Sequence, residues 1–396
     1  MTRPSTTGIA FVGCGFVADY YGLTLANHPS LRLVGVHDIL PERSAAFCQA
    51  WKTRAYDSLE ALLADPEVEI VVNLTPPHVH AEINLRALSA GKHVYCEKPL
   101  AMAIEDAEAV VRLAEEKGLV IAGAPANALS SARAHCARLL GSGVIGKPRL
   151  AYAEMEDGPV FRGNWRSWKS AQSGAPWPGV HEFTIGCTLE HSGYAASWLV
   201  SLFGAVDHVT AFASLAFPDK GPGTEGLSLG HDFSVGCLAF RSGVSARLTS
   251  GLGAPRDRSL TIVGDAGIIV VRDLWDEFSA VHVEPFGAKR PFWPRLVDRL
   301  EHEIGRKLGF RLTAGRSEAY PKGKRVLPPY PSRIDFARGV AVQAEAIRTG
   351  TAPYFSGRTA LHLTDIALAL HAGLNQHRPL PPAASAMDGD RTQSLS

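Results

Sequence analysis

Long hydrophobic runs are missing from this sequence. Roughly 18 consecutive apolar residues are needed to cross a bilayer, and no stretch approaches that length. The first residues carry one arginine and only a short apolar stretch before Gly13, which does not resemble a secretory signal. The chain is therefore expected to be cytoplasmic and to have no membrane partner.

An excess of charge and a cysteine framework are missing as well. The chain has 40 lysines and arginines against 39 aspartates and glutamates, with no long block of one sign. This balance predicts no nucleic-acid partner and favours a small-molecule one. The six cysteines lack the paired short spacings of a zinc site and the density of a disulfide scaffold, so we expect reduced thiols in the core. They are Cys14, Cys48, Cys96, Cys136, Cys187 and Cys237.

The chain is long enough for about two domains. Residues 1–125 alternate short apolar runs with amphipathic stretches, which predicts βαβ units and a parallel sheet covered on both faces. The expected strands are Ile9–Val12, Leu31–Val36, Ile70–Leu74, His93–Cys96 and Leu119–Ala122. The expected helices are Val17–Ala26, Pro41–Trp51, Ser58–Ala64, His80–Ala90 and Ile104–Lys117.

Residues 126–380 predict a second α/β domain built on a mostly antiparallel sheet. The expected elements are a helix at Ser130–Leu140, strands at 148–156, 206–217, 231–241, 244–251, Leu260–Val263 and Ile268–Val271, and helices at Asp335–Thr349 and Thr359–Ala372. Residues 285–332 are rich in Pro, Gly, Arg and Lys around a helical piece, Val297–Lys307, and predict a surface excursion. Residues 381–396 are expected to be disordered.

A glycine motif follows the first expected strand. Gly13 permits a tight turn, Gly15 lets the backbone approach a pyrophosphate, and Ala18 lets helix and strand pack closely. Asp38 ends the second strand, where an acid binds the adenosine ribose and favours NAD over NADP. Arg43 nearby leaves NADP open. The alternative is a plain glycine turn, with Asp38 capping the next helix.

Two further stretches resemble the Gfo/Idh/MocA oxidoreductase family. They are Asn73-Leu-Thr-Pro-Pro-His-Val-His80 and Gly91-Lys-His-Val-Tyr-Cys-Glu-Lys-Pro-Leu100, of which Glu97-Lys98-Pro99 is the most specific part. The resemblance covers residues 7–125 closely and reaches about 275 through Ile145-Gly-Lys-Pro148 and Gly264-Asp-Ala-Gly267. It implies an N-terminal Rossmann domain that binds NAD, or alternatively NADP, and a C-terminal domain whose large, mostly antiparallel open sheet forms a homodimer or homotetramer. The expected cofactor-binding residues are Gly13, Gly15, Phe16, Val17, Asp38, Arg43, Thr75, Pro76, His80, Glu97 and Lys98.

Lys98 is the first candidate catalytic residue. It follows a predicted strand, and ligands of open α/β sheets lie outside the carboxyl ends of strands. The resemblance implies that this lysine reaches the substrate hydroxyl that is oxidised. A surface lysine is the alternative.

A second catalytic element is expected at Glu190-His-Ser-Gly-Tyr194. The family has Asp-x-Gly-x-His in this place, so Glu190 takes the Asp position, Ser192 the Gly and Tyr194 the His. We expect Tyr194 to be the acid/base, with the Lys98 ammonium favouring its phenolate, and Glu190 to orient substrate hydroxyls. His191 is the alternative proton carrier, and a core tyrosine in a capped helix is the structural alternative. His181 and Glu182 nearby show no metal-binding spacing, so no metal is predicted.

The segment Phe161–Lys169, with Trp177 after it, hints at the substrate. Aromatic faces suit sugar rings and the cations suit an anionic group, although a core role for the tryptophans is an equal alternative. The candidate substrate-binding residues are Asn127, Arg162, Trp165, Arg166, Trp168 and Trp177.

These features predict an enzyme that transfers a hydride between nicotinamide C4 and a secondary alcohol or ketone of a sugar, nucleotide-sugar or cyclitol. Two alternatives stay open: an NAD-retaining glycosidase with a redox-neutral cycle, and a non-catalytic dinucleotide-sensing regulator.

Overall fold

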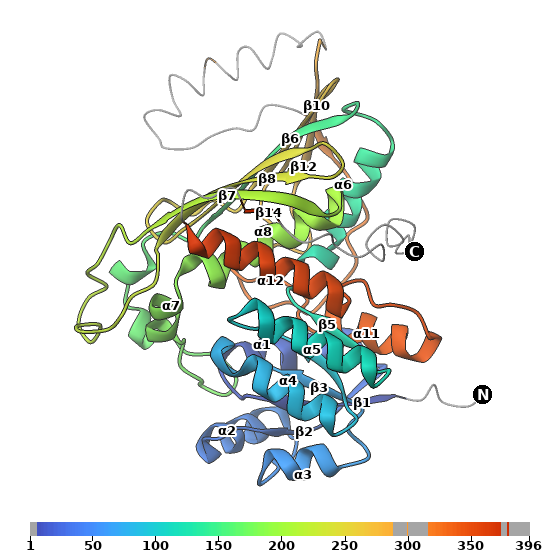
Figure 1. The fold of residues 1–396 in the computed structure, drawn as a ribbon, viewed down its shortest axis with the longest axis vertical. Helices are drawn as coiled ribbons and strands as arrows, with labels where there is room; N and C mark the ends of the chain where they lie inside the picture. Colours follow the sequence, from blue (N-terminus) through green and yellow to red (C-terminus); the bar gives the residue numbers. More distant parts are fainter. Residues whose placement is uncertain (1–5, 288–298, 300–315, 374–377, 380–396) are drawn as a thin grey trace.

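The computed structural model describes residues 6–287, 299, 316–373 and 378–379. Apart from residue 299, the expected helix Val297–Lys307 lies outside these ranges, as does the tail 381–396. Within them the chain forms two sheets, one above the other in Figure 1, with helices between and around them.

The N-terminal sheet is parallel and has the strand order β2-β1-β3-β4-β5. Successive residues of β1 point into different layers, because Ile9 and Phe11 pack in one apolar cluster while Ala10 and Val12 pack in another. Both faces are therefore covered, as the sequence predicts. The elements are β1 (Thr7–Val12), α1 (Phe16–Thr24), β2 (Leu31–His37), α2 (Pro41–Trp51), α3 (Leu59–Ala64), β3 (Ile70–Asn73), α4 (His80–Ser89), β4 (His93–Cys96), α5 (Ile104–Glu116) and β5 (Ile121–Gly123).

The C-terminal sheet has the order β13-β12-β11-β10-β6-β9-β8-β7-β14 among the described residues. Its neighbours pair antiparallel except for β6 and β9, which run parallel. Its strands are β6 (Pro148–Glu156), β7 (Val206–Ser214), β8 (Phe233–Phe240), β9 (Ser245–Gly251), β10 (Leu260–Gly264), β11 (Gly267–Val271), β12 (Val281–Pro285), β13 (Arg316–Glu318) and β14 (Arg378–Pro379). The last three are additions to the expected set, since each is short or lies in a polar stretch.

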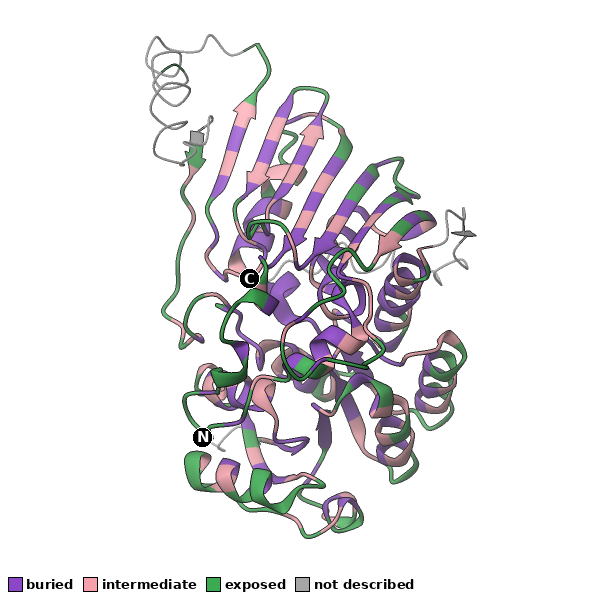
Figure 2. Ribbon diagram, turned by 90° about the vertical axis from the view of Figure 1, so that its left-hand side faces the viewer, coloured by how far each residue is buried: buried purple, intermediate pink, exposed green. Residues whose placement is uncertain are grey.

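Among the residues that the structure describes, helices cover only one face of the C-terminal sheet. These are α6 (Ser131–Gly141), α8 (Cys187–Phe203) and α12 (Gly357–Ala372), whose apolar side chains share one core with the inward strand residues. On the other face the residues are half-buried or exposed, which gives the alternating stripes of Figure 2. Cys237 lies on this outer face and is exposed, so the expectation that all six cysteines are core thiols is wrong for it. The reason is strand alternation, which sends odd-numbered β8 residues outward.

The C-terminal helices return to the N-terminal sheet. Phe336 and Val340, at the start of α11 (Arg338–Thr349), enter the same apolar cluster as β1. Gln343 donates hydrogen bonds to the carbonyls of Val94 and Val120, and α12 packs against both α5 and α8. No described helix is long and apolar enough to span a bilayer.

Candidate functional site

A cleft of about 860 Å³ lies where the carboxyl ends of the N-terminal strands face the C-terminal half. All of the expected cofactor-binding residues and the four expected catalytic residues line it. Strand ends far apart in sequence meet there because parallel strands finish at one edge of their sheet. The structure thus brings the two motif groups, around residues 13 and 98, together with the segment 190–194.

The glycine loop is shaped for close approach of a ligand. Gly13 has a φ of +98°, and a Cβ added there would lie 2.7 Å from the carbonyl oxygen of Leu74. A Cβ on Gly15 would meet no atom within 4 Å, so this position opens toward the cleft. Helix α1 begins immediately after Gly15 with no side chain capping it. Its first N–H groups are therefore available to an anion, and the site fits a dinucleotide pyrophosphate.

The Asp38 carboxylate is oriented by two backbone donors. Its Oδ2 accepts a hydrogen bond from the N–H of Cys14 (2.7 Å) and its Oδ1 accepts one from the N–H of Leu40 (2.9 Å). Helix α2 starts later, with Leu40 at its N-cap position. Asp38 therefore does not cap that helix, and the carboxylate is fixed at the edge of the cleft.

Lys98 and Glu190 form a buried pair between the two halves of the chain. Lys98 Nζ donates hydrogen bonds to the backbone oxygen of Glu190 (2.6 Å) and to its Oε2 (2.8 Å), and the two side chains are 12% and 14% exposed. Burial alone would lower the pKa of Lys98, but Glu190 and the surrounding acidic groups raise it above its ordinary value. Lys98 is thus a fixed ammonium and not a surface lysine.

Glu97 and His80 hold the strand ends that carry Lys98. Glu97 is buried and accepts a hydrogen bond from the hydroxyl of Tyr21 (2.7 Å). The His80 ring nitrogens lie 2.6 Å from the carbonyl oxygen of Pro99 and 2.7 Å from that of Thr75. These contacts tie the loops after β3 and β4 together, which fixes where Lys98 points.

Tyr194 contacts Lys98 through its ring, with Lys98 Nζ 5.4 Å from the ring centroid. Its ring also packs on Trp275 at 4.5 Å. Burial raises the pKa of Tyr194 above its ordinary value and outweighs the opposing effect of Lys98. Lys98 does favour the phenolate, as expected, but desolvation of the buried phenolate has the larger effect, so the net pKa of Tyr194 is raised. Tyr194 is a neutral phenol, which can donate a proton.

His191 lies between two carboxylates. Its Nε2 is 2.7 Å from Glu182 Oε1 and its Nδ1 is 3.2 Å from Asp157 Oδ2. Burial would lower the pKa of His191, but Glu182 and Asp157 raise it above its ordinary value. With both ring nitrogens facing protein carboxylates, His191 is placed to hold the cleft wall together.

The expected substrate-binding residues divide into two groups. Trp168 and Trp177 line the cleft, whereas Trp165 is buried in an aromatic cluster with Phe183. Arg162 and Arg166 are exposed and lie over the rings of Phe161 and Trp165. Asn127 is buried, and its Nδ2 donates to the carbonyls of Tyr194 and Leu274. Trp165, Arg162, Arg166 and Asn127 are not among the residues that line the cleft, and their contact with a substrate stays a prediction.

The sequence motifs do not identify several of the residues that line the cleft. His181 and Glu182 are histidine and carboxylate neighbours of the second motif, which is a signal for a functional site. No motif marks the other four, which come from sheet strands and their connections: Asp157, Arg256, Arg258 and Trp275. Arg258 binds Asp157 and lies 3.7 Å from the ring centroid of Trp275. Within the described part of the chain, no group of three or more His, Cys, Asp or Glu side chains is arranged to hold a metal ion.

Comparison with known proteins agrees with this geometry. Residues 7–123 match the model of the oxidoreductase family with an NAD-binding Rossmann fold. This match over the N-terminal domain confirms the resemblance to the Gfo/Idh/MocA oxidoreductases, the α/β fold class and the nicotinamide dinucleotide cofactor.

Three curated relatives show partial similarity. A 2,7-anhydro-N-acetylneuraminate hydratase of Mediterraneibacter gnavus is 28% identical over 45% of this chain and 47% of its own length. A 1,5-anhydro-D-fructose reductase of Ensifer adhaerens is 41% identical over 35% of this chain and 42% of its own. An inositol 2-dehydrogenase of Salmonella paratyphi B is 32% identical over 28% of this chain and 34% of its own length. The matches thus span less than half the length of these relatives.

Solved structures share the fold over nearly the whole chain. A levoglucosan dehydrogenase in complex with NADH and levoglucosan gives a TM-score of 0.75 at 19% identity, covering 95% of this chain and all of that one. The WlbA dehydrogenase of Bordetella pertussis, in complex with NADH and UDP-GlcNAcA, gives a TM-score of 0.70 at 19% identity. The match covers 96% of this chain and 99% of that one. At this identity the likeness establishes the two-sheet fold.

Proposed function

We propose that this protein is an NAD(P)-dependent oxidoreductase that interconverts a secondary alcohol and a ketone on a sugar, nucleotide-sugar or cyclitol. The observation that carries the proposal is the buried Lys98–Glu190 pair, which lies in the same cleft as the glycine loop. Two relatives support the proposal by their names, since one is named a 1,5-anhydro-D-fructose reductase and the other an inositol 2-dehydrogenase. When bound, the nicotinamide would supply or accept the hydride.

The residues of this chain would bind the substrate and carry its proton. Lys98, held as an ammonium by Glu190, would bind the reacting oxygen and stabilise the negative charge that develops on it. The neutral phenol of Tyr194 would donate a proton to that oxygen during ketone reduction and accept it in the reverse direction. The free carboxylate oxygen of Glu190 would accept a hydrogen bond from a neighbouring hydroxyl. Trp168 and Trp177 would contact the apolar faces of the substrate ring.

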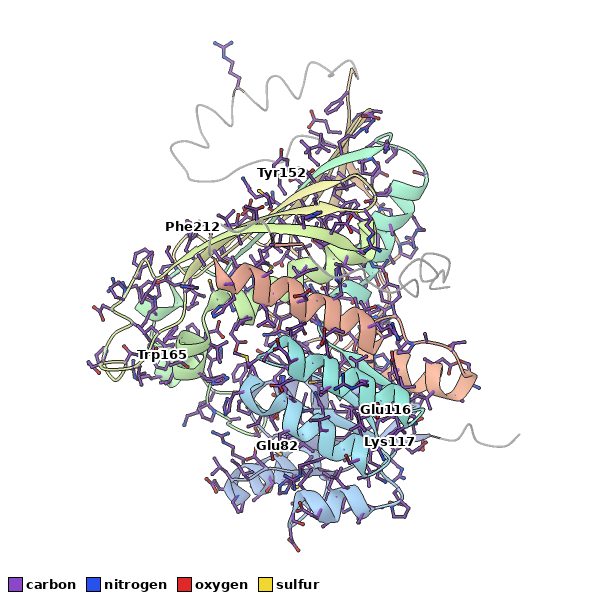
Figure 3. All side chains as sticks on the ribbon, viewed as in Figure 1. Glu82, Glu116, Lys117, Tyr152, Trp165 and Phe212 are labelled. Atoms are coloured by element: carbon purple, nitrogen blue, oxygen red, sulfur yellow. The ribbon has the colours of Figure 1, made fainter. Side chains whose placement is uncertain are left out.

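The test follows NADH formation or consumption at 340 nm with a panel of sugars, nucleotide-sugars and cyclitols and their keto forms. We expect Lys98→Met and Tyr194→Phe each to lower turnover by at least about 100-fold, the scale of a lost acid/base group. Lys117→Met, on the exposed end of α5 away from the cleft (Figure 3), is the matched control and should leave turnover unchanged. Intact turnover in both cleft variants would contradict the proposal.

A second candidate is a redox-neutral cycle with a retained cofactor. It is favoured by one observation, the similarity to a protein named as a hydratase, a reaction with no net redox change. In that case the protein would convert a glycoside or anhydro-sugar, and each cycle would return the cofactor to its starting oxidation state with no net formation or consumption of NADH. Mass spectrometry of the small molecules that the protein releases on denaturation distinguishes the two, since only this candidate needs stoichiometric bound dinucleotide.

We also propose self-association through the outer face of the C-terminal sheet, in the cytoplasm. Cross-strand register sets Phe212 opposite Val235 and Val235 opposite Thr249, so these side chains share that face. Phe212 and Leu150 are 47% and 40% exposed there. Exposed apolar side chains such as these on a sheet face are typical of a subunit interface.

A further inference from the structure

The segment between β6 and α7 (Gly179–Ile185) contains a small hairpin, residues 168–177, which we call the tryptophan hairpin. Its two arms pair through the bonds Trp177 N–H to the Trp168 carbonyl and Ser170 N–H to the Ala175 carbonyl, both 2.8 Å. At its base, Trp177 contacts Trp168 and Phe183 in an aromatic cluster. This base is fixed by packing, so any movement of the hairpin is left to its tip.

The tip of the tryptophan hairpin is bonded to the helix that follows the glycine loop. Asp19 on α1 accepts two hydrogen bonds on Oδ2, from the N–H (3.1 Å) and the hydroxyl (2.6 Å) of Ser173. Its Oδ1 accepts one from Trp51 Nε1 (2.6 Å). In Figure 1 the chain before α7 descends from the upper half to α1, which is the path of this contact. The contact joins residues 154 positions apart in the sequence.

The carboxylate of Asp19 is well suited to act as a releasable contact. It is completely buried, and a buried carboxylate requires hydrogen-bond donors. Ser173 supplies two of its three donors, so the closed hairpin satisfies the charge. When the tip detaches, the carboxylate becomes open to water, which replaces the lost donors and keeps the cost of opening modest.

The tryptophan hairpin and the dinucleotide loop line the same cleft. Trp168, Pro176 and Trp177 of the hairpin do so together with Gly13, Gly15 and Val17. A molecule bound along the glycine loop therefore shares the cleft with the hairpin. Because the hairpin tip is bonded to α1, this side of the cleft is closed by a bridge from one half of the chain to the other.

We propose that the tryptophan hairpin is a strap that retains the bound dinucleotide, with Asp19 and Ser173 as its latch. The inference rests on dinucleotide binding by the cleft and adds a residue, Asp19, whose role is to control the rate of cofactor exchange. The strap detaches at its tip to let the dinucleotide leave and rebinds to Asp19 behind a new one. It affects residence time and leaves the chemistry of Lys98 and Tyr194 unchanged.

The test measures NADH dissociation by stopped-flow fluorescence, with excess NAD as the displacing ligand and the full chain as the protein. Ser173→Asp sets a second carboxylate against Asp19, and Ser173→Ala removes the hydroxyl donor. We expect dissociation to accelerate about tenfold or more in Ser173→Asp and about threefold in Ser173→Ala, the scale of hydrogen bonds to a charged acceptor. Hydrogen exchange at residues 168–177 of the NADH complex should rise in the same order.

Trp51→Phe is the matched control, since it removes the other hydrogen bond of Asp19 and leaves Ser173 in contact. Because Ser173 keeps both of its hydrogen bonds to Asp19 in Trp51→Phe, the rate of NADH dissociation should stay within about twofold of that of the unaltered chain. Equal rates in all variants would overturn the strap while leaving dinucleotide binding established, and so would an equal acceleration in Trp51→Phe. Failure of the unaltered chain to bind NADH or NADPH would overturn the proposed function and the strap together.

Discussion

At the residue scale, Asp38 shows how a short motif acquires a defined role. The sequence leaves it as either a ribose ligand or a helix cap, and the structure removes the second option because α2 is capped at Leu40. Its two oxygens accept backbone bonds from Cys14 and Leu40, so the carboxylate has one orientation. A fixed negative charge at the end of β2 favours two ribose hydroxyls and disfavours a 2′-phosphate.

Asp38→Ser should weaken NAD binding by about tenfold or more, because hydrogen bonds to a charged acceptor are lost. NADP binding should change little or improve, since the repulsive charge is gone. Titration calorimetry with both dinucleotides gives the ratio of the two dissociation constants. Glu42→Gln, an exposed neighbour on α2, is the control. An unchanged ratio in Asp38→Ser would show that Asp38 does not discriminate.

Tyr194 illustrates a competition that sequence spacing cannot resolve. Glu190 and Tyr194 are one helical turn apart, and Lys98 does approach the tyrosine ring, as the motifs predict. The spacing says nothing about desolvation, which depends on Trp275 and the rest of the wall. Burial outweighs Lys98 and raises the pKa of Tyr194, so in the proposed reaction the tyrosine would act from its neutral form.

At the element scale, helix α8 is anchored to its surroundings by His191. The imidazole faces Glu182 of α7 on one side and Asp157, just after β6, on the other. Asp157 in turn binds Arg258, which lies over Trp275. The orientation of α8, and so of Glu190 and Tyr194, depends on this chain of contacts.

The His191 cluster should make stability depend on pH. Because its pKa is raised in the folded protein, its contribution is complete below the unfolded value of about 6.5 and is lost as the pH rises through the folded pKa. His191→Gln should therefore destabilise the protein by about 3 kcal/mol near pH 6, the scale of a broken buried ion pair, and by less near pH 9. Thermal unfolding followed by circular dichroism at both pH values measures the difference.

His362→Gln is the control for this experiment. Burial lowers the pKa of His362 to about 4, and its Nε2 accepts a hydrogen bond from the N–H of Val206. The folded ring is neutral at both pH values, whereas the unfolded ring is partly protonated near pH 6, so replacement of His362 should cost slightly less near pH 6 than near pH 9. A His191→Gln effect that is no larger near pH 6 than near pH 9 would mean that His191 is neutral in the folded protein.

At the scale of the whole molecule, the face of the C-terminal sheet that no described helix covers is the proposed surface for self-association. Phe212→Arg sets a charge in the middle of that face and should convert the assembly to monomers in sedimentation velocity. Glu116→Arg, exposed on α5 at the other end of the molecule (Figure 3), should leave the assembly intact. A sedimentation coefficient unchanged by Phe212→Arg would assign the contact to another face.

The sequence by itself determined the N-terminal half closely. The period of apolar residues marks each of the five parallel strands to within two residues at either end, because each strand is short, buried and bounded by a turn. The same local signals located the glycine loop, Asp38 and Lys98, since each role depends on a few adjacent residues. The motifs miss β12 and β13 of the second sheet because these short strands take their stability from pairing with the strands beside them.

Only the tertiary structure decided which aromatic and charged residues form the site. Trp165 and Trp168 are three positions apart in one segment, yet the first is in the core and the second lines the cleft. Asp157, Arg258 and Trp275 converge on His191 from separate parts of the chain. The Asp19–Ser173 contact likewise joins the two halves of the molecule. Such contacts depend on how sheets and helices stack, a long-range property that no local pattern of residues records.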